Sequence, residues 1–479
     1  MMRFLLVSVL LLSQSVLGYS QNDFINQLLK SHDFFETELI NLQIKRIEML
    51  GDQANYSNWD WDVSAELGRI HKDKFKYDYT SSTDYAQNTN QTVQKISSDL
   101  SKKFMSNGSE LIIAFDRSLP IKDEEMHDKN GYQKDKNTTE YLNDLSVNWT
   151  LPLLKNKNGL VDQKTYDLAV LDYEDEKQVL AEAQEDFIEE KVVEFIDWVD
   201  YQWQLQVVDS TIKKLANMRD KMASNHTRDR GILSRSLDKH RRVQQSLKSK
   251  LKAQNTVLLG SVDGIDFEQN PPTLNQKFGV HLIGDIRQYC QSKVRYLKRI
   301  KLEISKNNRS IETYDNSTLP DLDFSISASR DDNKGNYTSY SKSSETEYEA
   351  KLVLSYPLSG DITNQVYLDK YRLKSRQLTL KYNNKLNDVI ADVSKSETDI
   401  RQGQIQLSLI NEQLQALNPY YELNLYVNNQ SDIRFVANEA DDYQALKFEK
   451  IDTLIGLYKD KLEYDSLLDR LLPVKNPTL

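Results

Sequence analysis

The residue types that most often carry catalysis or bind metal ions are scarce in this chain of 479 residues, which has six histidines and one cysteine. No second histidine or cysteine lies near His71, His240 or His281 in the sequence, so we predict no metal site. The acidic pairs Asp441-Asp442 and Glu189-Glu190 are adjacent on expected helices, where neighbouring side chains point apart. We interpret both pairs as solvated helix faces and predict neither catalytic residues nor a cofactor.

Two further features also have structural interpretations. Cys290 lies in a stretch of helical character, cannot form a disulfide within the chain, and is expected to pack in a core. The basic run Lys239-His240-Arg241-Arg242 is interpreted as an exposed helix face, with contact to a partner protein as the alternative. The function of the chain must therefore be sought in its architecture.

The composition favours long solvated helices over a compact enzyme. Glycine (15) and proline (9) are scarce and charged residues make up 28% of the chain, while the mean hydropathy is −0.65. The net charge of −10 argues against nucleic acid as a partner, because phosphate binding needs clustered lysine and arginine.

The first residues have the pattern of a signal peptide. Arg3 precedes the apolar run Phe4–Leu12, and the small or polar stretch Ser13–Gly18 follows it. We predict that residues 1–18 are a cleaved signal peptide and that the protein is exported, with an uncleaved membrane anchor as the alternative. No later run of 18 apolar residues exists, so any membrane-spanning part must consist of β-strands.

Several stretches alternate between apolar and polar residues, as half-buried strands do. The clearest is Leu145–Leu153, and a polar turn containing Gly159 follows it. Asn107-Gly108 predicts a hairpin turn. The other expected strands are Trp59–Leu67, Leu111–Phe115, Leu322–Ala328 and Ala350–Tyr356. Three polar segments are expected to be exposed loops: Lys76–Gln91, Lys122–Thr139 and Asp331–Ser344.

Between the strands the hydrophobic period becomes helical. A helix from Asp162 to Met222 would be about 90 Å long, with apolar residues at the spacing of a coiled-coil seam. The chain is then expected to reverse at Gly231–Ser234 and again around Asn428-Asn429, with Asn418-Pro419 interrupting the preceding helix. The remaining expected helices are Asp23–Gln53, Ser236–Leu259, Leu282–Asn308, Asn364–Leu417 and a return helix that ends near Leu472.

The order of helix, strands, long helix, reversal and helix occurs twice. Pro152 matches Pro357, and Gly159 matches Gly360, at the two strand-to-helix junctions. We therefore predict a first repeat at 19–270 and a second at 271–479. The fold class is mainly α, with internally duplicated long helical hairpins and four or more β-strands.

Strands of about ten residues with one apolar face suit a membrane crossed at a tilt, although an ordinary sandwich face would show the same pattern. Aromatic residues near the strand ends, such as Trp149 and Tyr356, suit a membrane interface. Four strands cannot close a barrel, and amphipathic rods of this length need partners along their whole length. Both arguments imply an oligomer.

This doubled layout resembles the TolC family of outer-membrane efflux channels over nearly the whole mature chain. Leu319–Ile326 is similar to the family's entry into its second strand pair, and Leu151–Leu154 and Tyr356–Leu358 resemble its strand-to-helix junctions. Gly231–Arg235 and Tyr426–Ile433 look like its two helix-tip turns.

The resemblance implies a homotrimer in the outer membrane of a Gram-negative bacterium, with a shared twelve-stranded barrel and a helical tunnel across the periplasm. It further implies docking of a periplasmic adaptor and an inner-membrane transporter at the helix tips. The residues that match the tips are Gly231, Ile232, Leu233, Ser234, Arg235, Asn429, Ser431, Asp432 and Ile433. The expected lipid-facing residues are Val147, Trp149, Leu151, Leu322, Phe324, Ile326, Leu352 and Leu354.

Three positions depart from the family pattern. Asn429 stands where glycine is usual, although asparagine tolerates the left-handed backbone that such a turn needs. Asp238 lies about one residue late against the usual acid of the first tip. The hairpin at Asn107-Gly108 exceeds the four-strand plan and leaves the strand number open.

The resulting hypothesis is a passive exit duct of an efflux or type I secretion system, opened at its helix tips by the adaptor and transporter. The exported substrate is left open. Asp321 and Asp323 either line the lumen and favour cations or lie at a solvated strand end. The alternative function is an exported structural or adhesive coiled-coil protein without a pore.

Overall fold

The computed structural model describes the chain in stretches separated by short gaps. The described residues are 19–31, 33–78, 83–128, 133–222, 226–261, 272–274, 285–335, 342–356, 361–426 and 433–472. They divide into two compact units. Unit 1 comprises Met1–Gln43, Asp175–Lys301 and Leu380–Leu479, and unit 2 comprises Ile44–Glu174 and Leu302–Thr379. The predicted signal peptide lies outside the described residues, and the repeat boundaries stay a prediction.

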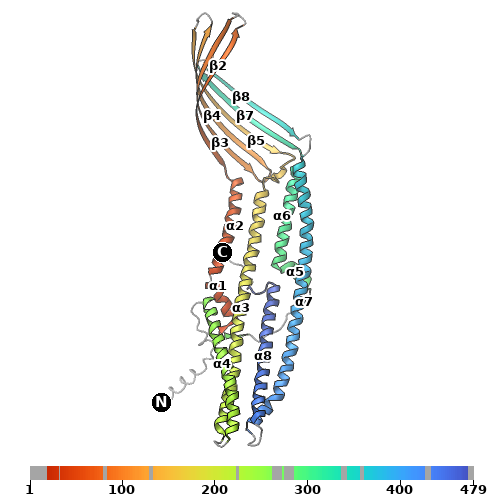
Figure 1. Ribbon diagram of the computed structural model, residues 1–479. Coiled ribbons are helices and arrows are strands. Elements are labelled where there is room, and N and C mark those ends of the chain that lie inside the picture. Colours follow the sequence, from red (N-terminus) through yellow and green to blue (C-terminus); the bar gives the residue numbers. More distant parts are fainter. Residues whose placement is uncertain are drawn as a thin grey trace, which may run out of the picture. The chain divides into compact units, whose positions relative to one another are not determined.

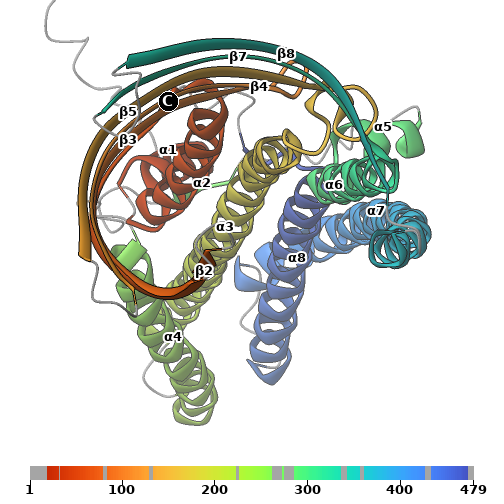
Figure 2. The ribbon, with the colours of Figure 1, turned by 90° about the horizontal axis from the view of Figure 1, so that it is seen from above.

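Unit 2 contains a curved antiparallel sheet with the strand order β2-β3-β4-β5-β7-β8 (Figures 1 and 2). The described sheet has six strands, so the hairpin at Asn107-Gly108 adds a complete strand pair. The strands are β2 (Asp60–Asp78), β3 (Thr83–Phe104), β4 (Ser109–Asp128), β5 (Gln133–Pro152), β7 (Asp321–Gly335) and β8 (Lys342–Ser355).

The prediction of three long polar loops was wrong. β2 and β3 remain paired as far as Asp78 and Thr83, which replaces the loop Lys76–Gln91. β4 and β5 likewise pair as far as His127 and Gln133, and β7 and β8 as far as Lys334 and Lys342. These segments are polar on both faces, so the alternation that marks a half-buried strand is absent from them. The backbone groups of these polar segments form hydrogen bonds with the neighbouring strand. The spacing of apolar residues within one segment does not reveal such pairing.

The strands are also longer than the ten residues expected, with lengths of 14 to 22 residues. The apolar parts of β2, β4, β5, β7 and β8 match the expected segments, and the additional length is polar. The hairpin turn predicted at Asn107-Gly108 is confirmed between β3 and β4, with Gly108 in the left-handed region at φ 72°.

The long helices lie where the helical period predicts them. The helix expected from Asp162 to Met222 is confirmed as α3. The described α-helices are α1 (Gln21–Ser31), α2 (Asp33–Ser57), α3 (Lys164–Lys221), α4 (Thr227–Ser261), α5 (Ile286–Lys293), α6 (Arg295–Ser317), α7 (Ile362–Tyr426) and α8 (Ile433–Leu467).

Three helix boundaries differ from the predictions. α4 begins at Thr227, so Gly231–Ser234 is helical and does not form the expected reversal. α7 continues through Pro419 to Tyr426, because a proline removes one helical hydrogen bond without ending every helix that contains it. The expected helix Leu282–Asn308 is divided at Val294, whose backbone is extended (φ −62°, ψ 120°).

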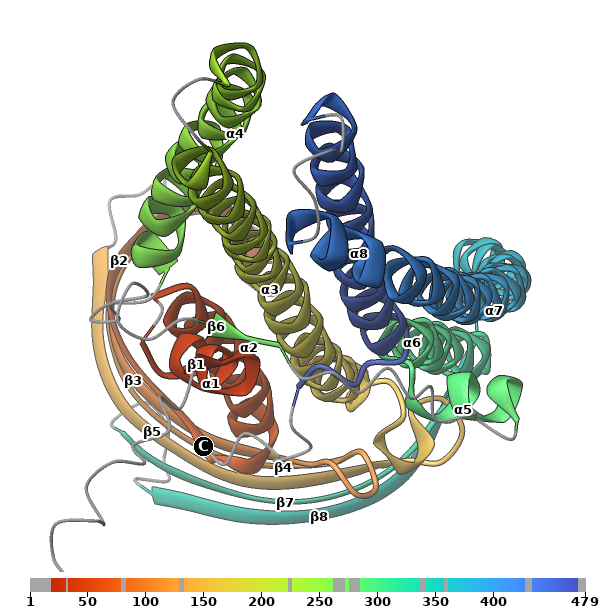
Figure 3. The same cartoon turned by 90° about the horizontal axis from the view of Figure 1, so that it is seen from below.

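The core of unit 1 is a set of seams between helices. The apolar residues that give α3 its coiled-coil spacing include Ile188, Val192, Phe195 and Val199, and all four are fully buried. Phe195 stacks on Phe24 of α1 with ring centroids 5.0 Å apart. Cys290 lies in a second buried cluster with residues of α6, α7 and α8, which confirms its predicted packing role. A short parallel pair, β1 (Tyr19–Ser20) with β6 (Pro272–Thr273), also belongs to unit 1 (Figure 3).

A buried ionic cluster joins three segments of unit 1. The Arg295 guanidinium binds Glu185 of α3 and lies 3.3 Å from Asp469, which follows α8. Asp469 also accepts a hydrogen bond from the Arg295 backbone N–H at the start of α6, and Glu185 accepts one from Leu471 N (2.7 Å). Because Glu185 is 2% exposed, its charge depends on these partners. No described helix combines the length and the apolar character needed to cross a membrane.

Candidate functional site

The predicted lipid-facing residues lie on one face of the sheet. The strand register places Trp61, Leu100, Ile113, Val147, Ala328 and Tyr348 in a single row across all six strands. Residues opposite one another in paired strands project to the same side. Trp149 lies opposite Ile326, Leu151 opposite Phe324, and Leu322 opposite Leu354. The structure therefore brings all eight predicted residues onto one face.

We call the apolar residues of this face the apolar band. It spans every strand of the sheet. Its members are Trp61, Val63, Ala65 and Leu67 of β2; Ile96 and Leu100 of β3; Leu111, Ile113 and Phe115 of β4; Leu145, Val147, Trp149 and Leu151 of β5; Leu322, Phe324, Ile326 and Ala328 of β7; and Tyr348, Ala350, Leu352 and Leu354 of β8.

The apolar band is exposed in the single chain. Trp61 is 69% exposed, Leu352 is 62% exposed and Leu354 is 67% exposed. Trp149 and Phe324 make an edge-to-face contact at 6.5 Å, so the band is partly ordered by its own aromatic residues. An apolar surface that spans six strands is larger than soluble monomers normally leave in water, and it indicates a surface that lipid or protein covers.

The opposite face of the sheet is polar. The neighbouring row contains Asp62, Asp99, Ala114, Ser146, Ser329 and Glu347 across the same six strands. Asp323 belongs to this face and lies opposite Val353, an apolar exception. Asp321, at the start of β7, accepts a hydrogen bond from Lys155 Nζ at 3.3 Å. A sheet with one apolar and one polar face matches a wall between lipid and an aqueous interior.

The position of the apolar band shifts from strand to strand. In β2 the band runs from Trp61 toward Leu67, and in β8 it runs from Tyr348 in the opposite direction to Leu354. Trp61 and Tyr348 belong to the same row, so the band shifts by about one residue at each of the five steps between strands. The strands run perpendicular to a row, with a rise of about 3.3 Å per residue and a separation of about 4.8 Å between neighbours. A shift of about one residue per strand therefore tilts the strands by about 35–40° from the normal to the apolar band. Membrane barrels have strand tilts of about 35–45°.

The sheet is connected to α3 through a tightly packed junction. The side chain of Asn156 accepts hydrogen bonds from Val161 N (2.9 Å) and Asp162 N (3.2 Å), and the Asn156 backbone N–H donates to Asn316 Oδ1 (2.7 Å). Gly159 has φ +67°, and a Cβ there would collide with the Met105 carbonyl oxygen. The junction thus requires glycine at position 159 for both conformation and space.

Replacing Gly159 by alanine is expected to destabilise unit 2 by about 2–3 kcal/mol, because the new methyl group meets a backbone carbonyl in a strained conformation. The matched control is Gly231→Ala. Gly231 is helical in α4 and a Cβ there has no atom within 4 Å, so this change should be neutral or stabilising by up to about 1 kcal/mol. Thermal unfolding of the purified protein in detergent measures both, and equal midpoints for the two variants would contradict the expectation.

The predicted residues of the first helix tip lie within α4 and form no turn. Leu233 is fully buried in a cluster with Leu215, Leu237, Ile433 and Ala440, while Arg235 Nε donates to the Gly231 carbonyl at 3.4 Å. Of the second tip, Asn429, Ser431 and Asp432 lie outside the described residues, and Ile433 is the buried first residue of α8. Their role in docking stays a prediction.

The structure pairs two side chains that the sequence analysis left without partners. His240 of α4 is 1% exposed, and its Nε2 lies 2.9 Å from Asp441 Oδ1 of α8. Lys239 Nζ donates to the other oxygen of Asp441 at 2.7 Å. Asp441 is therefore no simple solvated residue, and His240 does not belong to an exposed face. The error arose because the partner lies on a helix about 200 residues away.

Acid is expected to weaken this α4–α8 contact. Burial lowers the pKa of His240, an effect that Asp441 opposes and Lys239 reinforces. A folded-state pKa below the unfolded value of about 6.5 means that stability is lost as the pH falls through and below that value, with a slope of at most about 1.4 kcal/mol per pH unit. The difference in unfolding free energy between wild type and His240→Gln, measured from pH 8 to pH 5, should follow this sign. A pH-independent difference would contradict it.

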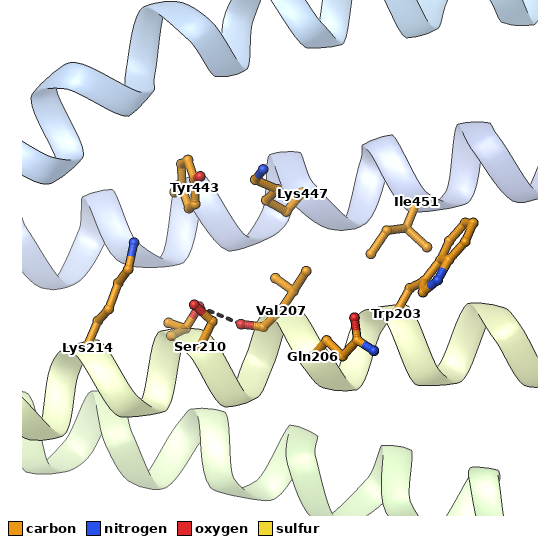
Figure 4. A pocket seen from close by; sticks show the side chains of 9 residues that line it. Trp203, Gln206, Val207, Ser210, Lys214, Tyr443, Lys447 and Ile451 are labelled. Carbon is orange, nitrogen blue, oxygen red and sulfur yellow. Dashed lines mark hydrogen bonds between the residues drawn. The ribbon is translucent and has the colours of Figure 1, made fainter. Parts of the chain in front are cut away.

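Unit 1 also contains a cavity of about 310 Å³ between α3 and α8 (Figure 4). Lys214 and Lys447 lie with their Nζ atoms 5.9 Å and 5.3 Å from the centre of the Tyr443 ring, and Trp203 lines the other end. The cavity contains none of the residues singled out from the sequence. In the described part of the chain, no three His, Cys, Asp or Glu side chains gather closely enough to hold a metal ion.

Comparison with known proteins supports an outer-membrane channel fold. No protein-family model and no curated protein matches the chain. Solved structures of outer-membrane proteins do match. The Campylobacter jejuni CmeC outer membrane channel covers 94% of this chain and 85% of its own, with TM-score 0.55 and 10% identity. The outer membrane protein VceC of Vibrio cholerae covers 94% and 96%, with TM-score 0.58 and 8% identity.

The Neisseria gonorrhoeae MtrE outer membrane channel is similar over 94% of this chain and 88% of its own, with TM-score 0.55 and 10% identity. The chain thus has the fold of these channels, which confirms the TolC-like fold expected from the sequence. At this level of identity the likeness establishes the fold.

Proposed function

We propose that this protein is a passive outer-membrane exit duct. The observation that carries the proposal is the exposed apolar band, which crosses all six strands at the tilt of a membrane barrel and lies opposite a polar face. Lipid covers the band, and the polar face lines an aqueous passage. The protein catalyses no reaction, and its contribution to transport is to provide a path.

The duct is a homotrimer in the outer membrane of a Gram-negative bacterium, with its helices in the periplasm. Two observations support an oligomer. The described sheet is open, with β2 and β8 at its edges, and unpaired strand edges are not tolerated in lipid. In addition, the helices expose large apolar residues, including Leu373 (71%) and Ile405 (63%) of α7, which neighbouring helices of other copies would cover.

The partners are a periplasmic adaptor and an inner-membrane transporter, which dock at the helix ends near Gly231–Arg235 and Asn429–Ile433. Their docking opens the duct by rearranging these ends. The buried contact of His240 with Asp441 ties α4 to α8 within this region and must rearrange if the two helices separate. The system is a tripartite efflux pump or a type I secretion system, and its cargo is a small toxic compound, a metal ion or a polypeptide.

The test is single-channel conductance of the detergent-purified protein in a planar bilayer, with the oligomeric mass measured on the same sample. A trimer with discrete, long-lived openings is the expected result. A monomer, or an oligomer that inserts without current, would overturn the proposal and favour the exported coiled-coil protein without a pore.

A further inference from the structure

The free edges of the sheet determine how copies of this chain can join, provided that the proposed channel function holds. β2 and β8 are the edge strands of the described sheet, and neither pairs with the other within the chain. Both carry the apolar band on the same face, with Trp61–Leu67 on β2 and Tyr348–Leu354 on β8. β2 and β8 also run in opposite directions, because five antiparallel steps separate them. An antiparallel contact between β8 of one copy and β2 of the next therefore continues the pattern.

We propose that β8 of each copy pairs with β2 of the next, so that every chain contributes all six strands and a three-chain ring closes as an eighteen-stranded barrel. This differs from the twelve strands that the family resemblance implies. The alternative is closure through four strands, in which β8 meets β4 and the hairpin of β2 and β3 stays outside the wall. β2 pairs with β3 over its entire length, Asp60–Asp78, and both strands carry members of the apolar band, which favours their place within the wall.

Charge and tilt together select the register of the contact. The band must remain on one face, which permits only registers that differ by two residues. Among these, the register with Glu66 opposite Lys351 pairs opposite charges on the polar face. It also places Ala65 opposite Leu352 and Val63 opposite Leu354 within the band. Glu66 and Lys351 project to the polar face, since they lie opposite Lys95 and Ser325 in their own sheet.

This register also satisfies the closure of a barrel. The row of opposite residues that begins at Trp61 of β2 ends at Tyr348 of β8. In the proposed register Tyr348 lies opposite Arg69 of the next copy, so the row is displaced along β2 from Trp61 to Arg69 for each chain. Repeated around three copies, that displacement gives a strand tilt of about 43°, which lies within the range of about 35–45° found in barrels. The backbone diameter would be about 35 Å for eighteen strands, against about 24 Å for twelve.

The wider barrel deepens the proposed function. Barrels of this strand number leave a water-filled channel, and the wall here is lined by the polar face with its Asp, Ser and Glu residues. The outer opening would therefore not be the narrowest part of the duct, and it would admit hydrated cargo of polypeptide size. Selection of cargo then belongs to the helical part and its partners.

Cysteine cross-linking tests the contact in the full-length protein in its native membrane. Ala65→Cys with Leu352→Cys places two thiols opposite one another, with a Cβ separation of about 4.5 Å at closest approach, which is the upper end of the range for a disulfide. The expected result is a covalent trimer, with dimer as the intermediate and nothing larger, which reductant returns to monomer. Ser64→Cys with Leu352→Cys is the matched control, because its thiols project to opposite faces. The native Cys290 is buried in unit 1.

Three results would overturn parts of the proposal. Cross-linking of Leu352→Cys to cysteines at Leu111, Ile113 or Phe115 of β4 would show four-strand closure. Cross-linking to Val63→Cys in place of Ala65→Cys would show a different register. A protein that conducts ions as a trimer but cross-links at neither edge would contradict the six-strand contact while leaving the proposed function intact, whereas a monomer without current contradicts the proposed function itself.

A charge exchange provides an independent measurement that needs no thiol. Glu66→Lys should reduce the fraction of trimer that survives mild SDS several-fold, because two lysines then face one another. Adding Lys351→Glu should restore that fraction. Failure of the second change to restore it, with the first change harmful, would contradict the pairing of these two residues.

Discussion

Replacing Leu352 by arginine is expected to block assembly of the protein in the outer membrane. Leu352 is a member of the apolar band, is 62% exposed in the single chain and lies opposite Phe324. An arginine on the lipid side near the middle of a bilayer costs about 2–4 kcal/mol. The proposed trimer would contain the change three times, so its barrel would lose about 6–12 kcal/mol. Membrane fractionation and the yield of SDS-resistant oligomer measure the loss.

Val353→Arg is the matched control for this experiment. It is the adjacent residue on the same strand, is also apolar and exposed, and lies opposite Asp323 on the polar face. An arginine there faces water and an acidic neighbour, so assembly should be unaffected. Val147→Arg in β5 should reproduce the defect of Leu352→Arg. If Leu352→Arg assembles as well as Val353→Arg, the apolar band does not face lipid and the coiled-coil function without a pore gains support.

Replacing Arg295 by methionine is expected to destabilise the helical unit by about 3–5 kcal/mol, because it leaves Glu185 buried without its cation. Glu185 would retain the backbone N–H of Leu471, and Asp469 would retain that of position 295. Neither compensates for the missing charge. The free energy of unfolding, measured with denaturant at neutral pH, reports the loss. The matched control is Arg401→Met, because the Arg401 side chain is 60% exposed and its ion pair with Glu397 within α7 contributes little.

The pH dependence distinguishes an uncompensated charge from lost packing. Burial raises the pKa of Asp469, and Arg295 opposes that rise through its backbone and its charge. Without the cation, the Asp469 carboxyl group should take up a proton at higher pH than in the wild type. The cost of a raised carboxyl pKa is present above the folded-state pKa and is relieved as the pH falls. The deficit of Arg295→Met should therefore be smaller at pH 5 than at pH 8, and a constant deficit would point to packing instead.

The length of each element illustrates what periodicity can reveal. The apolar residues of α3 repeat at helical spacing over many turns, so its limits were predicted within about two residues. The strands were predicted only where one face is apolar, and their polar extensions were taken for loops. Those extensions exist because the neighbouring strand continues to supply backbone hydrogen bonds, as between Asp78 and Thr83. No residue pattern within a single segment encodes that support.

The charged contacts illustrate a second difference. His240 and Asp441 lie on helices far apart in the sequence, and both were interpreted as ordinary surface residues. Arg295, Glu185 and Asp469 likewise come from three segments, and the sequence analysis did not single them out. Such pairs form because helices pack against one another and place particular turns of two helices side by side. Within one helix, the spacing in the sequence tells which side chains are neighbours. No such rule tells which side chains of two different helices will meet.

The sequence by itself determined the long helices and the two faces of the strands, and it predicted a need for partner copies. These depend on local periodicity and on the cost of leaving apolar surface and strand edges in the wrong solvent, which are properties of the segments alone. Only the tertiary structure decided that six strands form one sheet, that the apolar band shifts by about one residue per strand, and that His240 meets Asp441. Register and contacts between helices depend on residues distant in the chain, and therefore only the folded molecule reveals them.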